Sequence, residues 1–549
     1  MTAASTLLEV ADLTVGFGPH RAQRPVVKGV SFSVRAGECL AIVGESGSGK
    51  SVTARTLLGL TGGHSRVEAG CLEFNGTNLL GLSGRQWRKL RGSQIGFILQ
   101  DALVSLDRLR LVGQEIAEPL RLHGWGTRAA RQRKVVELLT QVGVPEPEVR
   151  ARQRPAELSG GLRQRALIAS AIALDPALIV ADEPTTALDV TVQAQILGLL
   201  ERTKAQGKAL ILISHDLAVV ARLADQVAVM QDGVFVEQGP AGQVLARPRA
   251  AYTRTLLDAV PSAHAKGSRL SGGRSGAGAA PGGSGHPPDA AGTPVIRAEG
   301  LVKRYLGPDG RTRTVVDGVS FVLRAGETLG VVGESGSGKT TTARIVLALT
   351  APEEGQVLLD GQPWTSVPEK QRRERRRRIT TIYQDPLSSF DPRWSVGHII
   401  ADSIQPAGYP SREARQQRVS ELLALVGLAE EHRDRRPLQL SGGQRQRVAI
   451  ARALGPGPSV IVCDEPVSAL DVSIQAQVLD LLSDLQSELA VSYLFISHDL
   501  GVVHHMSDRV VVMKDGRIVE TGTADEVFGQ PSEPYTRQLI DALPSLDVA

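Results

Sequence analysis

Cysteine is scarce in this chain of 549 residues, which has three, Cys39, Cys71 and Cys463, and no Cys-X-X-Cys pair. A disulfide framework or a cysteine-based zinc site is therefore not expected, and the composition suits a reducing compartment. Long apolar runs are also missing, since no stretch approaches the roughly 20 residues that a membrane-spanning helix needs. The N-terminus lacks a basic segment followed by an apolar one, so we expect no secretory leader.

Strong charge of either sign is absent too. Lysine and arginine total 62 against 58 acidic residues, a net charge of +4, which is too small to indicate a nucleic-acid partner. The basic run KQRRERRRR at 370–378 has no interleaved aromatic residues, and we interpret it as a solvated face. The hydrophobic share of 42% is typical of globular proteins. At this length, more than one domain is expected.

The chain contains two copies of one pattern. Equivalent motifs lie 282 to 289 positions apart: GESGSGK at Gly44 and Gly333, DEP at Asp182 and Asp464, and ISHDL at Ile213 and Ile496. A nearly constant offset predicts two whole homologous domains. Residues 262–293 between them are rich in Gly, Ala, Ser and Pro, which is typical of a flexible linker. We therefore assign residues 1–261 to the first domain and 294–549 to the second.

The string LSGG occurs three times, starting at Leu158, Leu270 and Leu440. The outer two copies precede helix-like segments and lie 282 positions apart, which matches the domain repeat. The middle copy lies inside the linker, and nothing helical follows it. We interpret the middle copy as a chance match without a binding role.

Each half has a glycine-rich turn between a strand-like run, CLAIV or TLGVV, and a helix-like segment. Strand, turn and helix are the context that a Walker A phosphate-binding loop requires. Its glycines let backbone N–H groups surround phosphate oxygens at a helix N-terminus. The lysine should reach the β- and γ-phosphates, and the hydroxyl after it should bind Mg²⁺. The loop residues are Gly44, Ser46, Gly47, Gly49, Lys50 and Ser51, and Gly333, Ser335, Gly336, Gly338, Lys339 and Thr340.

Two acidic residues close an apolar run in each half, Asp182 with Glu183 and Asp464 with Glu465. Apolar runs of this kind are typical of central parallel strands, whose carboxyl ends form the ligand-binding edge of an α/β sheet. The first acid of each pair is expected to hold Mg²⁺ through water. The second is placed to polarise an attacking water molecule, so we predict Glu183 and Glu465 as general bases.

A histidine ends a further apolar run in each half, His215 after ALILIS and His498 after SYLFIS. Because the residue recurs in register, we predict that it senses the γ-phosphate. His504 and His505 have no counterparts in the first half, and we interpret them as ordinary helix residues.

Taken in order, the Walker A loop, LSGG[QL]RQR, DEP followed by ALD, and SHD resemble the nucleotide-binding domain of ATP-binding cassette (ABC) proteins over nearly all of both halves. The resemblance implies an α/β protein of two tandem P-loop NTPase domains. Each would have a RecA-like α/β core, an antiparallel β subdomain and a helical subdomain. It also implies ATP hydrolysis, with ATP and Mg²⁺ as cofactors.

The resemblance assigns roles to further residues, one set in each half. Phe17 and Tyr305 resemble the aromatic residue that stacks on adenine. Gln100 and Gln384 resemble the Q-loop glutamine, which contacts Mg²⁺ and faces the membrane partner. The signature residues would be Ser159, Gly160, Gly161, Ser441, Gly442 and Gly443, and the D-loop acids Asp189 and Asp471.

In this family two domains stack head to tail, and the signature of one caps the nucleotide held by the other. The resemblance thus implies that Lys50 works with Ser441, and Lys339 with Ser159. Both halves have the complete set of motifs, so two hydrolytic sites are expected.

The segments DEPTTALDVTVQAQIL and DEPVSALDVSIQAQVL resemble the paired D-type and F-type ATPase subunits of dipeptide, oligopeptide and nickel importers. Each half also ends in a tail similar to that family's C-terminal extension, although the histidine of its usual HPYT is missing from both. Some relatives carry an iron–sulfur cluster beyond this tail. No cysteine lies there in this chain, so no cluster is expected.

The resemblance therefore implies the ATPase of a binding-protein-dependent importer for di- or oligopeptides, peripheral on the cytoplasmic face of the cell membrane. Its partners would be two transmembrane permease subunits, docked on helical insertions near 101–157 and 385–439, and indirectly an extracytoplasmic substrate-binding protein. No nucleic acid is expected. Nickel or glutathione import, export, and a twin-cassette translation factor are alternatives; the short linker with few charges disfavours the last.

Overall fold

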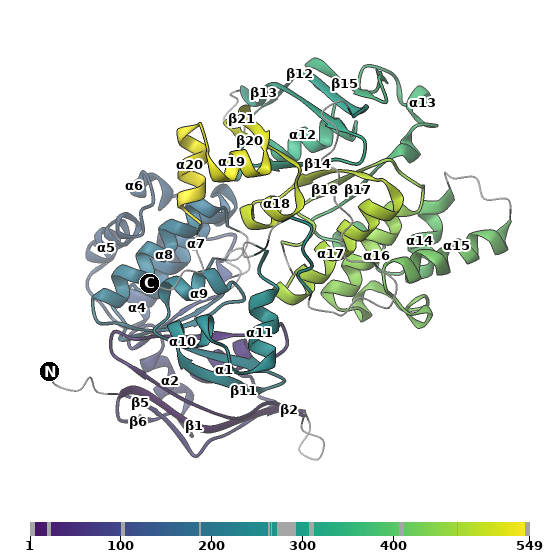
Figure 1. The fold of residues 1–549 in the computed structure, drawn as a ribbon. Helices are drawn as coiled ribbons and strands as arrows, with labels where there is room; N and C mark the ends of the chain where they lie inside the picture. The colour runs from purple at the N-terminus through teal and green to yellow at the C-terminus, as the bar shows by residue number, and fades with distance from the viewer. Residues whose placement is uncertain are drawn as a thin grey trace. The chain divides into compact units, whose positions relative to one another are not determined.

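The structure is a computed structural model that divides into two compact units, one ending at Leu257 and the other spanning Asp258–Leu543 (Figure 1). It describes residues 6–18, 24–99, 105–185, 188–261, 264, 266–271, 292–306, 312–405, 411–468 and 470–543. Each unit contains an antiparallel sheet, a six-stranded and mostly parallel sheet, and a helical insertion. The predicted fold class is thereby confirmed.

The antiparallel sheet of the first unit has the order β2-β1-β5-β6, with β4 also paired to β1. Buried and exposed residues alternate along much of β2, as expected for a strand with one face on the core. The strands are β1 (Thr6–Phe17), β2 (Arg24–Arg35), β4 (Ser65–Glu68), β5 (Cys71–Phe74) and β6 (Thr77–Asn78).

The six-stranded sheet of the first unit has the order β11-β10-β3-β9-β8-β7, and only the β10–β11 pair is antiparallel. Every residue of β3, β8 and β9 is buried, which explains their continuous apolar sequences. The strands are β3 (Cys39–Val43), β7 (Ile95–Ile98), β8 (Leu178–Asp182), β9 (Ala209–Ile213), β10 (Gln226–Gln231) and β11 (Val234–Pro240).

Helices follow the strands of this sheet and also form the insertion after β7, in which α4 packs on α5 and α7. None of the helices that the structure describes, in either unit, is long and apolar enough to span a bilayer. The helices of the first unit are α1 (Lys50–Thr56), α2 (Gly84–Leu90), α4 (Val112–Leu122), α5 (Arg128–Gln141), α6 (Pro147–Arg150), α7 (Gly160–Ala171), α8 (Val190–Ala205), α9 (Leu217–Leu223), α10 (Ala241–Ala246) and α11 (Ala251–Asp258).

The second unit repeats this architecture, with sheets ordered β13-β12-β15-β16 and β17-β18-β19-β14-β20-β21. Its strands are β12 (Pro294–Leu306), β13 (Thr312–Arg324), β14 (Thr328–Val332), β15 (Glu354–Leu359), β16 (Gln362–Pro363), β17 (Ile379–Ile382), β18 (Val460–Asp464), β19 (Ser492–Ile496), β20 (Arg509–Lys514) and β21 (Arg517–Thr523). Its helices are α12 (Lys339–Val346), α13 (Glu369–Arg372), α14 (Val396–Ile404), α15 (Arg412–Leu425), α16 (Gly442–Leu454), α17 (Val472–Leu489), α18 (Leu500–Met506), α19 (Ala524–Gly529) and α20 (Pro534–Asp541).

Part of the segment predicted to be a flexible linker is anchored on the second unit. Leu270 is 1% exposed, and the N–H groups of Leu270 and Ser271 donate to the carboxylate of Asp480 on α17. The guanidinium of Arg269 donates to both oxygens of Asp484 at 2.8 Å. The prediction of a flexible segment is therefore wrong for residues 269–271, because two carboxylates and the burial of Leu270 hold them, while the interpretation of the middle LSGG as a chance match stays a prediction.

The basic run at 370–378 is also partly structural. The indole of Trp364 is fully buried, and the guanidinium carbons of Arg372, Arg375 and Arg376 lie 6.0, 5.8 and 5.2 Å from its ring centroid. Arginine at this distance from an aromatic face is attracted by the ring. These three arginines are half-buried over a core tryptophan, whereas the other basic residues of the run are exposed, as predicted.

Candidate functional site

In each unit the glycine-rich loop, the acid pair and the histidine lie at the ends of neighbouring strands, at one edge of the six-stranded sheet. In the first unit Ile213, the last residue of β9, is paired with both Ile42 of β3 and Asp182 of β8. In the second unit Ile496 is paired with Val331 and Asp464 in the same way. Because these strands are parallel and end level, the segments that follow them emerge side by side.

Only glycine fits at the first position of the loop after β3 and of the equivalent loop after β14. Gly44 has a φ of 146°, and a Cβ atom there would lie 2.1 Å from the carbonyl oxygen of Met230. Gly333 has a φ of 147°, and its Cβ would lie 2.2 Å from the carbonyl oxygen of Met513. The close approach packs each loop against the end of the neighbouring strand, β10 or β20.

A buried lysine ammonium lies inside each loop. Lys50 is 5% exposed, and its Nζ donates to the carbonyl oxygens of Gly44 and Glu45, both at 2.7 Å. Lys339 is 7% exposed and makes the same two contacts with Gly333 and Glu334 at 2.7 Å. A buried cation needs such partners. The arrangement places one positive charge where the loop would surround a phosphate group.

A hydroxyl and a carboxylate adjoin each loop. The Oγ of Ser51 donates to Oδ1 of Asp182 at 3.0 Å, and the Oγ1 of Thr340 donates to Oδ1 of Asp464 at 3.5 Å. Burial raises the pKa of both carboxyls. A nearby cation would favour their ionised form. Hydroxyl and carboxylate oxygens are the hard ligands that Mg²⁺ prefers, so these pairs fit a magnesium ion.

The second acid of each pair occupies an unusual backbone conformation. Glu183 has a φ of 49° and Glu465 a φ of 51°, in the left-handed region that non-glycine residues rarely adopt. The N–H of Glu183 donates to the carbonyl of Ile213, and that of Glu465 to the carbonyl of Ile496, both at 2.9 Å. Such strain costs on the order of 1–3 kcal/mol and persists where the surroundings impose it, often at functional sites.

This turn brings each glutamate to the predicted histidine. The Nδ1 of His215 lies 3.4 Å from Oε1 of Glu183, and the Nδ1 of His498 lies 3.2 Å from Oε2 of Glu465. In the second unit the Nε2 of Gln384 also donates to Oε2 of Glu465 at 2.7 Å. Gln100, the equivalent glutamine of the first half, lies outside the described residues.

The pair of Glu465 and His498 has opposite pKa shifts. Burial raises the pKa of Glu465, but the hydrogen bond and charge of His498 and the charge of Lys339 outweigh it, and the net pKa is lowered. Burial lowers the pKa of His498, but the carboxylate of Glu465 outweighs it, and the net pKa is raised. The carboxylate is thus held ionised, as a general base requires.

The signature residues form helix N-termini. Ser159 precedes α7 and accepts from the N–H of Leu162, and Ser441 precedes α16 and accepts from the N–H of Gln444. The glycines that follow, Gly160 and Gly161 or Gly442 and Gly443, open these helices. A Cβ at Gly161 or Gly443 would lie 2.7 or 2.5 Å from a side chain of α8 or α17. Exposed N–H groups at such an end suit an anion.

The remaining predicted residues lie on adjoining elements. Phe17 ends β1 and packs on the core, and Tyr305 on β12 is 42% exposed. Their contact with adenine stays a prediction. Asp189 and Asp471 precede α8 and α17 at the N-cap position. His504 and His505 belong to α18, with His505 3% exposed.

Sequence reasoning missed two tyrosines of the tails. The hydroxyl of Tyr252 accepts a hydrogen bond from the N–H of Glu45, and that of Tyr535 from the N–H of Glu334, both at 3.1 Å. Each tyrosine hydroxyl therefore contacts the predicted phosphate-binding loop of its own unit. The available signal was the repetition of YTR at positions 252 and 535.

The coupling between Glu465 and His498 can be measured. We expect Glu465→Gln to lower the pKa of His498, because the carboxylate that outweighs burial is removed while burial remains. Histidine-selective NMR titration of the full chain without nucleotide or metal would report it, with Glu183→Gln as the matched change in the other unit. The ion pair stabilises the fold between the lowered pKa of Glu465 and the raised pKa of His498. An unchanged His498 pKa in Glu465→Gln would contradict the pairing.

Two family models match this chain. The family model described as ABC transporter matches residues 27–186 and 316–468, and the model of the oligopeptide/dipeptide transporter C-terminal region matches residues 236–283 and 519–549. Similar relatives include the oligopeptide transport ATP-binding protein OppD of Mycobacterium tuberculosis, 42% identical over 99% of both chains. The peptidoglycan transport ATP-binding protein YejF of Agrobacterium fabrum is 43% identical over 98% of this chain and 97% of its own.

A third relative is the glutathione import ATP-binding protein GsiA of Escherichia coli, 43% identical over 98% of this chain and 90% of its own. The likeness therefore covers both cassettes and both tails in one chain. With two matched cassettes and full-length relatives at this identity, the chain belongs to the ABC transporter family.

Proposed function

We propose that this chain is the ATPase of a binding-protein-dependent importer whose cargo is a peptide. The observation that carries the proposal is the complete set of lysine, hydroxyl, acid pair and histidine at the sheet edge of both units. Matches of both tails to the oligopeptide/dipeptide transporter region support peptides as the cargo class.

The residues of each site have different proposed roles in ATP hydrolysis. Lys50 and Lys339 bind phosphate oxygens, and the loop N–H groups surround them. Glu183 and Glu465 orient the attacking water and accept its proton, a role worth about 10²–10⁴ in rate. His215 and His498 hold these carboxylates and face the γ-phosphate.

A magnesium ion would be held by the hydroxyl and carboxylate beside each loop, with Gln100 and Gln384 as further ligands. When bound it would neutralise charge on the phosphates. The ligand sets are Ser51, Asp182 and Gln100, and Thr340, Asp464 and Gln384.

Each nucleotide is proposed to lie between the two halves. Lys50 would work with the signature serine Ser441, and Lys339 with Ser159. A serine at a helix N-terminus supplies a hydroxyl and N–H groups to the γ-phosphate. Fusion of both halves in one chain keeps their effective concentration high. ATP binding would draw the halves together, and hydrolysis would separate them.

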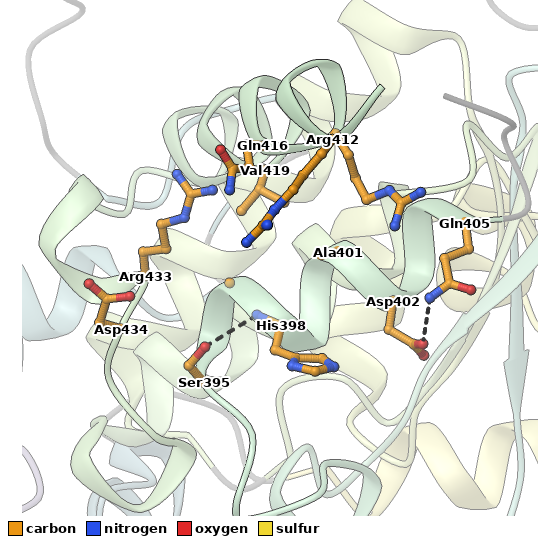
Figure 2. A pocket seen from close by; sticks show the side chains of 12 residues that line it. Ser395, His398, Ala401, Asp402, Gln405, Arg412, Gln416, Val419, Arg433 and Asp434 are labelled. Atoms are coloured by element: carbon orange, nitrogen blue, oxygen red, sulfur yellow. Dashed lines mark hydrogen bonds between the residues drawn. The ribbon is translucent and has the colours of Figure 1, made fainter. Parts of the chain in front are cut away.

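The permease subunits are proposed to dock on the helical insertions, which places the chain on the cytoplasmic face of the membrane. Figure 1 shows α14 and α15 of the second insertion side by side, apart from the antiparallel sheet of that unit. A hollow of about 400 Å³ lies between them, and Figure 2 shows Arg412 from α15 and His398 and Asp402 from α14 around it. Its mixed charges suit a polar protein segment.

Glutathione, a tripeptide, is a second candidate cargo. The relative named for glutathione import is 43% identical, against 42% for the relative named for oligopeptide transport. The two candidates share the peptide class, and this small difference in identity does not separate them.

Partner capture tests the function. We expect the tagged chain with Glu183→Gln and Glu465→Gln, solubilised gently from native membranes with Mg-ATP, to copurify with two multi-span proteins identified by mass spectrometry. A copurifying substrate-binding protein would carry the cargo, and its bound ligand would distinguish glutathione from longer peptides. The matched control is the same chain with Lys50→Ala and Lys339→Ala, which removes nucleotide-dependent capture. Recovery of ribosomal proteins without membrane subunits would contradict the proposal.

Paired substitutions test the composite sites. Lys50→Ala with Ser441→Arg damages a single proposed site, so ATP binding at the other remains. Lys50→Ala with Ser159→Arg damages both, so ATP-induced closure is lost. Closure would be followed by distance measurements between spin labels on the two halves, using full-length protein and Mg-ATP. If each half formed its own site, Lys50→Ala with Ser441→Arg would damage both sites, and Lys50→Ala with Ser159→Arg would damage only one.

A further inference from the structure

The tail of each half reaches the phosphate-binding loop of the same unit. Residue 252 lies on α11 and residue 535 on α20, both beyond the six-stranded sheet in sequence. The Tyr252 hydroxyl and the Glu45 N–H are joined across 207 positions, and the Tyr535 hydroxyl and the Glu334 N–H across 201. The tail is thereby connected to the second residue of GESGSGK in both units.

A glutamate fixes where each tail helix begins. Glu237 on β11 accepts from the N–H groups of Arg249 and Ala250, at 2.8 and 3.0 Å, just before α11. Glu520 on β21 accepts from the N–H groups of Ser532 and Glu533, at 2.7 and 3.3 Å, just before α20. Charge-assisted bonds of this kind are stronger than neutral ones. Each tyrosine therefore stands on a helix whose first turn is tied to the sheet.

The second residue of the loop is held on two sides. The carbonyl oxygen of Glu45 accepts from Lys50, and its N–H donates to Tyr252. The hairpin turn between β10 and β11 adds a third anchor, because the N–H of Gly233 donates to the carbonyl of Ser48 at 3.0 Å. The N–H of Ser48 also donates to the carbonyl of Glu45 at 3.2 Å, whereas the contact with Tyr252 uses only the N–H of Glu45.

A bound phosphate would change which of these contacts hold the loop. A phosphate group attracts the ammonium of Lys50, which then shares or gives up its contact with the carbonyl of Glu45. The contact with the tyrosine involves no charged group and does not compete with the nucleotide. It can therefore keep the start of the loop in place while the lysine is engaged.

We propose that Tyr252 and Tyr535 are positioning residues for ATP, each holding the first turn of its phosphate-binding loop in the form that receives the phosphates. The C-terminal region of each half is then part of its nucleotide site. The inference rests on the proposed binding of ATP by these two loops. Phenylalanine would fill the same space but leave the loop N–H without its acceptor.

The test isolates one loop at a time in the full chain. Glu183→Gln and Glu465→Gln prevent turnover, and Lys339→Ala disables the second loop. In this background we expect Tyr252→Phe to weaken MgATP binding about ten-fold, the effect of one unsatisfied N–H. Thr255→Ala, an exposed change on the same helix, is the matched control and should leave the dissociation constant within about two-fold.

The same test with the first loop disabled shows whether each tyrosine affects ATP binding only at the loop that it contacts. With Lys50→Ala in place of Lys339→Ala, Tyr535→Phe should weaken binding about ten-fold, and Tyr252→Phe should have much less effect. Thermal unfolding of each variant would be followed alongside, because a purely structural tyrosine would lower the melting temperature without this selectivity.

The outcomes distinguish the inference from the proposed function. If MgATP binding survives Lys50→Ala combined with Lys339→Ala, the loops are not the nucleotide sites and the proposed function fails. If those changes abolish binding but the tyrosine variants bind as the parent does, or weaken binding equally in both backgrounds, the inference is overturned.

Discussion

The structure of each site depends on the register of three parallel strands. In the first unit β3, β8 and β9 are short, fully buried and level at their carboxyl ends. Each strand is followed by a different segment of the proposed site: the glycine-rich loop, the acid pair or the histidine. A slip of one residue would turn every side chain to the other face of the sheet. The apolar runs that fix this register therefore also fix the distances between the groups that are proposed to act on ATP.

Much of the site followed from the sequence because each motif is attached to a strand with an unambiguous pattern. Lys50, Asp182 and His215 were expected at one edge, and the pairing of Ile213 with Ile42 and Asp182 brings their strands there. The fold class was predictable for the same reason. The left-handed conformation of Glu183 was not, because it is imposed by a backbone hydrogen bond to the next strand and has no local signature.

The missed features depend on contacts between residues far apart in sequence. Tyr252 reaches Glu45 only after the sheet and the tail helix have formed, and nothing near either residue indicates the other. The glycine- and serine-rich sequence around Leu270 does not predict that this residue packs on the second unit. This packing depends on Asp480 and Asp484, where the first half has Gly198 and Arg202, so the two halves differ at a surface that the shared motifs do not mark.

Each unit is proposed to supply the lysine of a separate nucleotide site, which the signature serine of the other unit completes. Equilibrium dialysis of the full chain with Glu183→Gln and Glu465→Gln, in saturating Mg-ATP, counts the nucleotides that are bound. We expect two nucleotides per chain, one after either Lys50→Ala or Lys339→Ala, and none after both. A single nucleotide per chain whose binding is insensitive to one of these lysines would contradict this proposal.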